Sequence, residues 1–466
     1  MFAPVAMLKK TSEFLALRRN TSLLLGALVL AGTGEKLWLG FAPKYIETVG
    51  GGVFIIGLFD ALQTLLGAVY AWPGGWLTDR WGQRRALLTF SAVSVAGYLL
   101  VLMWPHWLAL LFGSFLFLAW SALSLPTTFA VVATSLERHR HTMGIGVQSL
   151  VRRVPMMVGP LIGGWLLTRY GWADGVKCAL AVCIGLSLLT AAFQWFMGSF
   201  DVQEWTRIGA MNLRDQQSGA GVSPARVGEA DAPLTLARSP GRRDACPSLP
   251  FMESGTGFQP VHLHKKHDGQ DARPTTFAGV VQSFTPALRE LLVSDILIRF
   301  CERIPYAFVI LWAIDHGGLT AQQFGYLVAC EMITAMLCYI PVAHLADKYG
   351  RGPFVLVTFV FFTLFPVTLL WAHGFGWLAF AFVVRGLKEF GEPARKALII
   401  GEAAPELRAR TYGAYYLIRD CTVTTGSLLG AWLWHISPQA NFIGAAICGA
   451  LGTAWFWCFI YRKRDT

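Results

Sequence analysis

The sequence predicts an all-α membrane protein of twelve transmembrane helices, arranged as two pseudo-symmetric six-helix bundles. Three observations lead to this fold class. Of the 466 residues, 54% are hydrophobic and only 14% are charged, whereas soluble domains carry about 25% charged residues. The apolar residues form long runs, each near the roughly 20 residues that a membrane-spanning helix needs. The two halves of the chain also repeat the same residues in the same order.

Twelve apolar runs define the predicted helices. They are long and continuous, whereas a strand of a membrane β-barrel would show about ten residues of alternating character. The first six runs cover residues 22–48, 53–77, 86–104, 107–134, 143–167 and 175–198. The second six cover residues 291–314, 322–343, 354–372, 376–401, 411–434 and 440–461. We therefore predict one bundle at residues 1–198 and a second at residues 287–466.

Residues 199–286 differ from the rest of the chain in composition. The stretch is rich in Gly, Pro, Ser and charged residues and lacks apolar periodicity, which predicts a mostly disordered cytoplasmic linker. Lys and Arg gather in both tails and in every second short loop, while the opposite loops carry only Arg169 and Lys177. The positive-inside rule then places both termini in the cytoplasm of a multi-pass protein of the inner or plasma membrane. A net charge of +11 therefore does not indicate nucleic acid.

An internal repeat relates the two halves at an offset of 267–269 residues. The pair Glu35-Lys36 corresponds to Glu302-Arg303, and Arg152 corresponds to Arg419. Further matches join Gln63 to Glu331, Asp79 and Gly82 to Asp347 and Gly350, Pro126 to Pro393, and Gly163 to Gly430. An ordered set of matches indicates duplication. Two parallel repeats favour alternating access, with a binding site where the halves meet.

Residues 75–87 read GWLTDRWGQRRAL, and residues 343–355 read AHLADKYGRGPFV. Both resemble the loop signature of the major facilitator superfamily, Gly-x-Leu-x-Asp-Arg-x-Gly-Arg-Lys. Gly allows a tight turn, and an Asp beside helix N-termini can pair with a neighbouring cation. We expect a conformational latch, with a simple basic topology anchor as the alternative. Its residues are Gly75, Asp79, Arg80, Gly82, Arg84, Asp347, Lys348, Gly350 and Arg351.

The fifth predicted helix contains PMMVGPLIGGW. Gly159, Pro160, Gly163 and Gly164 resemble the Gly-x-x-x-Gly-Pro-x-x-Gly-Gly motif of proton-coupled exporters in the superfamily, although Pro155 stands at the leading Gly. Small residues let helices approach closely, and Pro bends a helix. The resemblance favours export, while ordinary tight packing explains the same residues equally well.

Ionisable residues within the predicted spans are the candidates for the site. A charge at mid-bilayer costs at least about 2.5–3.5 kcal/mol and is functional by default. In the superfamily, helices 1, 5, 7 and 11 line the central cavity, so we expect Glu35 to pair with Arg152 or Arg153, and Glu302 with Arg419. The substrate and proton-coupling candidates are Glu35, Lys36, Asp60, Arg152, Arg153, Glu302, Arg303, Glu331, Arg385, Glu389, Arg419 and Asp420.

The tenth predicted helix carries one charged stripe. Its members lie one helical turn apart and are Arg385, Lys388, Glu389, Glu392, Arg395 and Lys396. The alternative to a functional stripe is that its charges pair with one another, Glu389 with Arg385 and Glu392 with Arg395 or Lys396. The segment from Glu392 to Lys396 is predicted to be structural, and Arg385 and Glu389 to be functional. Six aromatic residues are weaker candidates for an apolar lining: Trp38, Phe41, Tyr45, Tyr306, Tyr415 and Tyr416.

These observations predict a secondary active transporter of a small organic solute that works by alternating access. A carboxylate that loses its arginine partner in one conformation binds a proton there, so we expect proton coupling, with export favoured. The alternatives are a proton-linked importer of an anionic or zwitterionic metabolite, and a membrane-embedded sensor or enzyme. The sequence shows no nucleophile, metal or phosphate-binding motif in a supporting context. We expect a monomer without cofactor, metal or nucleic acid, whose partners are the substrate, protons and the lipid bilayer.

Overall fold

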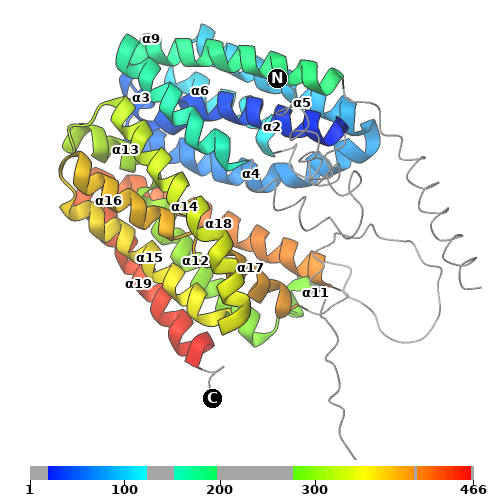
Figure 1. Cartoon of the computed structure of the whole chain (residues 1–466), viewed down its shortest axis with the longest axis vertical. Coiled ribbons are helices and arrows are strands. Elements are labelled where there is room, and N and C mark those ends of the chain that lie inside the picture. Colours follow the sequence, from blue (N-terminus) through cyan, green and yellow to red (C-terminus); the bar gives the residue numbers. More distant parts are fainter. Residues whose placement is uncertain (1–18, 123–151, 197–276, 404–406, 463–466) are drawn as a thin grey trace, which may run out of the picture. The chain divides into compact units, whose positions relative to one another are not determined.

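A computed structural model describes residues 19–122, 152–196, 277–403 and 407–462. Contacts within the chain define one compact unit of residues 1–199 and 262–466, and a second unit of residues 200–261, which lies outside the described residues. The described part consists of helices joined by short connections (Figure 1). The predicted linker lies mostly outside it, although residues 277–282 of that segment form a short helix.

The N-terminal bundle begins with α2 (Arg19–Trp38), which continues through η1 (Leu39–Phe41) into α3 (Ala42–Thr48). The helices α4 (Val53–Trp81), α5 (Gln83–Met103) and α6 (Trp107–Phe117) follow. The end of the predicted fourth span and the start of the fifth fall within residues 123–151, outside the described residues. The next helix, α9 (Arg153–Trp195), covers the fifth and sixth spans, because Gly171 has a non-helical backbone with φ of 78° and divides it.

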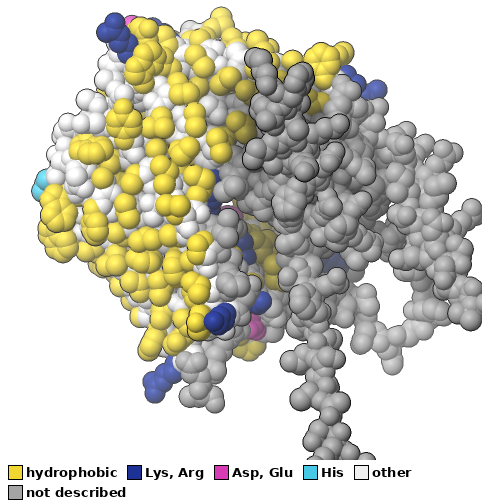
Figure 2. Space-filling model, viewed as in Figure 1, with side chains coloured by type: hydrophobic (Ala, Val, Ile, Leu, Met, Phe, Trp, Pro, Cys, Tyr) yellow, Lys and Arg dark blue, Asp and Glu magenta, His cyan; other side chains and the backbone are white. Residues whose placement is uncertain are grey.

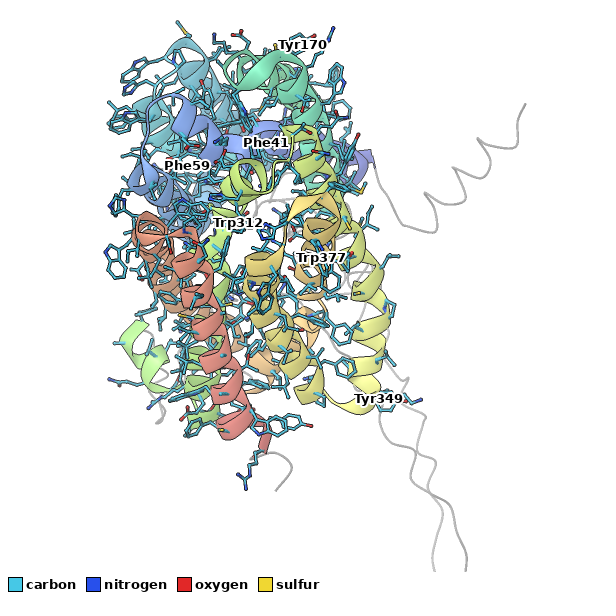
Figure 3. The ribbon with its side chains drawn as sticks, turned by 90° about the vertical axis from the view of Figure 1, so that its left-hand side faces the viewer. Phe41, Phe59, Tyr170, Trp312, Tyr349 and Trp377 are labelled. Carbon is cyan, nitrogen blue, oxygen red and sulfur yellow. The ribbon has the colours of Figure 1, made fainter. Side chains whose placement is uncertain are left out.

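The C-terminal bundle follows the short α11 (Phe277–Gln282). Its first span comprises α12 (Pro286–Tyr306), α13 (Val309–Leu311) and the π-helix η3 (Trp312–His316). The remaining spans are α14 (Ala321–Tyr349), α15 (Gly352–Trp371), α16 (Gly374–Leu387) with α17 (Glu392–Gly401), α18 (Arg408–Ile436), and α19 (Pro438–Phe456) with η4 (Trp457–Tyr461). Tyr349 and Trp377 mark opposite ends of these helices (Figure 3).

The helix boundaries have local causes. Thr320 and Gln323 form a capping box at the start of α14, which satisfies two backbone N–H groups that the first turn leaves unpaired. Thr285 and Ser437 cap α12 and α19 more simply, because each hydroxyl oxygen accepts a hydrogen bond from one backbone N–H of the first turn. Gly82 and Gly350 have φ of 80° and 89° at the matched loops of the two bundles. This confirms the tight turn that the loop signature predicts.

The predicted tenth span is not one continuous helix. The helix α16 ends at Leu387 and α17 begins at Glu392. Pro393 is the physical reason, because it lacks an N–H and its ring excludes the carbonyl four residues earlier. Gly391 fits the break closely: its N–H donates to Thr358 Oγ1, and an added Cβ would clash with the carbonyl group of Phe354. The charged stripe is therefore divided between two helices.

Six helices of the described part are long and apolar enough to cross a membrane. They are α2–α3, α4, α5, α9, α15 and α19–η4. Other spans of the C-terminal bundle carry ionisable side chains, among them Arg299 and Glu302 on α12 and Arg419 and Asp420 on α18. Exposed apolar side chains cover much of the visible described surface (Figure 2). The large apolar side chains that are more than half exposed include Leu188, Leu337 and Trp371. Such a surface is suited to lipid and not to water.

Glycines set matching helix contacts in the two bundles. A Cβ added to Gly163 would clash with the carbonyl oxygen of Leu37, and a Cβ added to Gly430 would clash with that of Ile304. Both members of each contact are related by the same offset of 267 residues. The close approach of α9 to α2 thus recurs between α18 and α12, which is structural support for the duplication.

The bundles meet near the connections between spans 1–2, 5–6, 7–8 and 11–12. Lys44 Nζ donates to Asp315 Oδ1 at 2.5 Å, and the backbone N–H of Gln322 donates to Thr168 Oγ1 at 3.0 Å. Glycines allow close backbone contact here too, since an added Cβ would lie 2.5 Å from the Ala321 carbonyl oxygen at Gly164 and 2.5 Å from Ala431 Cβ at Gly57. We call this region the closed end.

Candidate functional site

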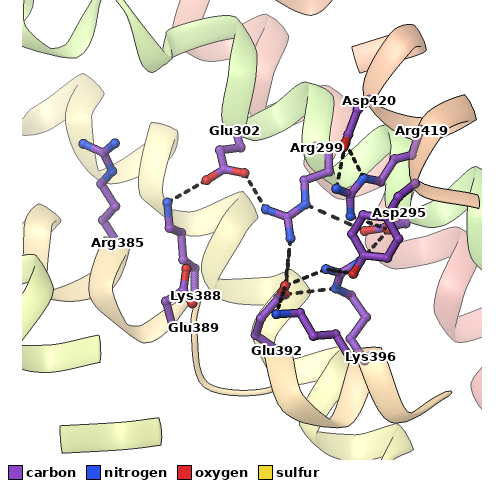
Figure 4. A network of polar contacts seen from close by, with 12 residues as sticks. Asp295, Arg299, Glu302, Arg385, Lys388, Glu389, Glu392, Lys396, Arg419 and Asp420 are labelled. Atoms are coloured by element: carbon purple, nitrogen blue, oxygen red, sulfur yellow. Dashed lines mark hydrogen bonds and ion pairs between the residues drawn. The ribbon is translucent and has the colours of Figure 1, made fainter. Parts of the chain in front are cut away.

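A network of ionised side chains lies among α12, α16, α17 and α18 (Figure 4). Arg299 is at its centre: it donates to Glu302 Oε2 at 2.7 Å and to Glu392 Oε2 at 3.2 Å. Lys388 donates to the other oxygen of Glu302, also at 2.7 Å. Each buried charge thus has opposite charges beside it, which offsets the desolvation that burial imposes.

Asp295 anchors a second group of charges in the same network. Its side chain is fully buried, and its Oδ2 atom accepts hydrogen bonds from Arg395, from Arg419 at 3.4 Å and from the Tyr415 hydroxyl at 3.1 Å. Arg419 also binds Asp420 at 2.7 Å. Asp295 is not among the site residues predicted from the sequence. Its position four residues before Arg299, on the same helical face, is the signal that could have identified it.

A third group links α14 to α16. Arg385 Nε lies 3.1 Å from Glu331 Oε1, and Lys388 Nζ lies 3.7 Å from the same oxygen. Glu331 is 4% exposed. Gly386 permits this contact, because a Cβ there would lie 2.7 Å from the backbone oxygen of Glu331.

Two ion pairs near this network connect the two bundles. Asp60, on α4, lies 3.3 Å from Arg303 on α12 and also accepts a hydrogen bond from the Ser427 hydroxyl on α18. Arg153, on α9, donates to Glu389 at 3.0 Å. Asp60 is 2% exposed. A carboxylate that is buried between two bodies is held by both, so movement of the bundles must change its surroundings.

The remaining charges of the N-terminal bundle lie close together. Lys36 donates to Glu35 at 2.9 Å, and Glu35 is 7% exposed. Arg152 is partly buried near Glu35, within electrostatic reach but without a hydrogen bond or ion pair to any described residue.

The structure tests the predicted pairings. The predicted pairing of Glu392 with Arg395 or Lys396 is confirmed, because Glu392 lies 2.6 Å from Arg395 and 3.7 Å from Lys396. The predicted pairing of Glu302 with Arg419 was wrong. Glu302 accepts hydrogen bonds from Arg299 and Lys388, and Arg419 donates to Asp295 instead. The pairing of Glu389 with Arg385, which was the alternative to a functional role, is not formed: Glu389 contacts Arg153, and Arg385 lies beside Glu331. Glu35 contacts Lys36 instead of a helix 5 arginine.

A small recess adjoins these charges, and three aromatic side chains line it. They are Tyr306, Phe362 and Phe365, together with Glu302, Arg385 and Lys388. Tyr306 is 43% exposed, and the guanidinium groups of Arg303 and Arg385 lie 4.7 and 5.5 Å from its ring centre. Most of the other aromatic candidates are core residues instead: Trp38, Phe41, Tyr45 and Tyr415 are at most 1% exposed.

The predicted latch is described in part. The side chains of Asp79 and Asp347 and the surroundings of Gly75 are not part of the described structure. Arg80 and Arg84 stack on the rings of Trp76 and Trp195, at 5.3 and 4.8 Å. Lys348 stacks on Tyr349, and Arg351 donates to the Ala397 carbonyl oxygen at 3.3 Å. These contacts hold the cations at the helix ends, and the pairing of the two aspartates stays a prediction.

The small residues of the helix 5 motif have definite contacts. An added Cβ would lie 2.6 Å from Lys36 Cβ at Gly159 and would meet α14 of the other bundle at Gly164. The backbone oxygen of Pro160 faces Gly325 of α14 equally closely. The motif therefore packs α9 against helices of both bundles.

The model of the Major Facilitator Superfamily matches residues 24–221 and 291–466. The match covers most of the chain, and the chain belongs to this superfamily. The predicted family and fold class are thereby confirmed. This membership places the protein in a membrane and among transport proteins, not among enzymes.

Curated relatives include drug-resistance proteins. Multidrug resistance protein MdtG of Enterobacter lignolyticus is 28% identical over 183 residues, which is 38% of this chain and 43% of that protein. The class C tetracycline resistance protein of Escherichia coli is 25% identical over 151 residues, or 32% of this chain and 38% of that protein. The matches span less than half of the length of these relatives. They agree with the exporter-like branch that the helix 5 motif favours.

Solved structures share the fold over nearly the whole chain. A POT family transporter in complex with a thioalcohol conjugated peptide has a TM-score of 0.65 at 12% identity, covering 96% of both chains. The nucleoside transporter NupG has a TM-score of 0.64 at 12% identity, covering 95% of this chain and 98% of that one. Similarity at this identity extends to the fold alone.

Proposed function

We propose that this protein is a secondary active transporter that exports a small organic solute by alternating access. The observation that carries the proposal is the set of ion pairs between the bundles, Asp60 with Arg303 and Arg153 with Glu389. Buried charges between two bodies that the chain joins only through a long segment are suited to rearrangement. The drug-resistance relatives favour export.

The contacts at the closed end indicate which state of the alternating-access cycle this conformation represents. By the positive-inside rule both termini are cytoplasmic, so the connections 1–2, 5–6, 7–8 and 11–12 are on the opposite face. The contacts Lys44–Asp315 and Thr168–Gln322 lie there. We therefore propose that this conformation is shut on the outer face and that transport requires these contacts to separate.

Protons are the proposed coupling ion. Asp60 is the best candidate, because it is buried and its partners Arg303 and Ser427 belong to the other bundle. When the bundles move, Asp60 loses a cation, and a carboxylate without its cation binds a proton more readily. Glu35 is the second candidate, since its cation Lys36 is 33% exposed. We propose a monomer as the transporting unit.

Solute flux in proteoliposomes tests this function. Purified protein is reconstituted at fixed orientation, a pH gradient is imposed, and a solute panel is followed on both sides. We expect at least one solute to move against its gradient at the expense of the pH gradient. A flux rate that does not depend on the pH gradient would contradict proton coupling. The absence of any protein-dependent flux would contradict transport.

A further inference from the structure

Arg152 stands apart from the other predicted cations of the site. Lys36, Arg153, Arg303, Arg385 and Arg419 all have carboxylate partners. Arg152 lies at the start of α9, partly buried, and has no hydrogen bond or ion pair to a described residue. Glu35 is within electrostatic reach of Arg152 but forms no ion pair with it. A partly buried cation without an ion pair is unfavourable, so its retention calls for a ligand or a function.

The internal repeat shows what Arg152 lacks. Its counterpart Arg419 binds Asp295 at 3.4 Å and Asp420 at 2.7 Å. The positions 267 residues before these two aspartates hold Leu28 and Arg153. The same arginine is thus neutralised twice in one bundle, while in the other bundle one acid is replaced by an apolar residue and the second by another cation.

The surroundings of Arg152 suit an organic acid. Lys36 is within electrostatic reach of both Arg152 and Tyr306, and its side chain is 33% exposed. Tyr306 belongs to the recess with Phe362 and Phe365. Lys36 of the N-terminal bundle therefore lies near Arg152 and near the exposed ring of Tyr306 in the C-terminal bundle. A guanidinium group binds a carboxylate with two parallel hydrogen bonds, which gives strength and orientation.

We propose that Arg152 and Lys36 bind the acidic group of an amphipathic organic anion, whose apolar part lies against Tyr306 in the aromatic recess. This inference rests on the proposed function only in taking the ligand as the transported solute. An anion held by one bundle and an apolar body held by the other would connect ligand binding to the movement of the bundles.

Binding of matched compounds tests the inference. Three aromatic acids, 4-phenylbutyrate, benzoate and indole-3-acetate, are compared with their uncharged amides and with the amine 4-phenylbutylamine, by calorimetry and by thermal stabilisation of the purified full chain. We expect the acids to bind more tightly than the amides and the amine to bind least. If amides or the amine bind as tightly as the acids, or if none of the acids binds, the inference is wrong.

Variants then locate the acidic group. Arg152→Gln is expected to weaken acid binding by about tenfold or more, because a charge-assisted hydrogen bond is lost, and Arg152→Lys to retain part of the affinity. Arg169→Gln, an exposed cation on the same helix, is the matched control and should bind as the wild type does. Unchanged affinity in Arg152→Gln overturns the assignment.

The repeat supplies an independent variant. Leu28→Asp introduces the carboxylate that Asp295 provides in the other bundle, so it should occupy Arg152 and weaken acid binding, whereas Leu28→Asn should not. Equal affinities in these two variants would contradict the inference even if Arg152→Gln does not fold. Flux measurements distinguish the two proposals. An acid that binds but never crosses the bilayer contradicts the transport function alone. A protein that transports a solute but binds no acid contradicts this inference alone.

Discussion

Gly164→Ala should open the closed end. An alanine Cβ at this position would lie 2.5 Å from the Ala321 carbonyl oxygen and 2.9 Å from Gln322 Cα, below the 3.0 Å that real Cβ atoms keep. Both neighbours are backbone atoms and cannot turn away, so overpacking costs about 1–3 kcal/mol. The clash exists only while the bundles meet here. The conformational equilibrium should therefore shift by about 5–150-fold toward the open state.

Thiol accessibility measures this shift. Ala431→Cys reports on the closed end, because Ala431 is fully buried and faces Gly57 of the other bundle. On a background without native cysteines, Gly164→Ala should raise the rate of maleimide labelling by the factor given above. Gly185→Ala is the matched control, since it lies in the same helix with open space around its Cβ. Equal labelling rates in the two variants would refute the reasoning.

Three further predictions concern coupling and the linker. Asp60→Asn should make flux insensitive to the pH gradient, because an amide cannot bind the proton that the Asp60 carboxylate takes up when it separates from Arg303. Flux is measured beside the exposed control Asp174→Asn, and intact proton coupling in Asp60→Asn would exclude Asp60 as the proton site. Glu302→Gln should lower thermal stability and gradient-driven flux together, because Arg299 and Lys388 lose their shared carboxylate. A variant as stable as the wild type would contradict this prediction. Deleting residues 201–261 should leave flux unchanged, and its loss in correctly inserted protein would reject a passive linker.

The sequence was sufficient for the fold because its signals are local or repeated. Long apolar runs predict the spans, and glycine at positions 82 and 350 predicts the loop turns, which their φ angles confirm. Pro393 was visible too, and a proline within a predicted helix is a known cause of a break. The continuous tenth helix was predicted because the charged stripe matched helical spacing on both sides of that proline.

Pair formation could not be predicted in the same way. Ion pairs depend on which helices touch and on how helix 10 is divided, and neither is encoded in spacing along one helix. Glu389 reaches Arg153 of the other bundle across 236 residues of sequence. Asp295 was missed because it lies near the start of the predicted span 291–314, whereas in the structure it lies midway along α12 and binds two arginines there. The internal repeat was more informative than the depth of a residue in the membrane, because the repeat identifies Arg152 as the counterpart of Arg419, which two aspartates neutralise.

A reversible cross-link at the closed end tests alternating access most directly. Thr168→Cys with Gln322→Cys places two thiols where the side chain of Thr168 now accepts from the Gln322 backbone at 3.0 Å, with the exposed Cys421 and Cys458 replaced by serine. We predict that oxidation stops gradient-driven flux in proteoliposomes and that reduction restores it, while each single cysteine variant is unaffected. Full flux through quantitatively cross-linked protein would contradict the account.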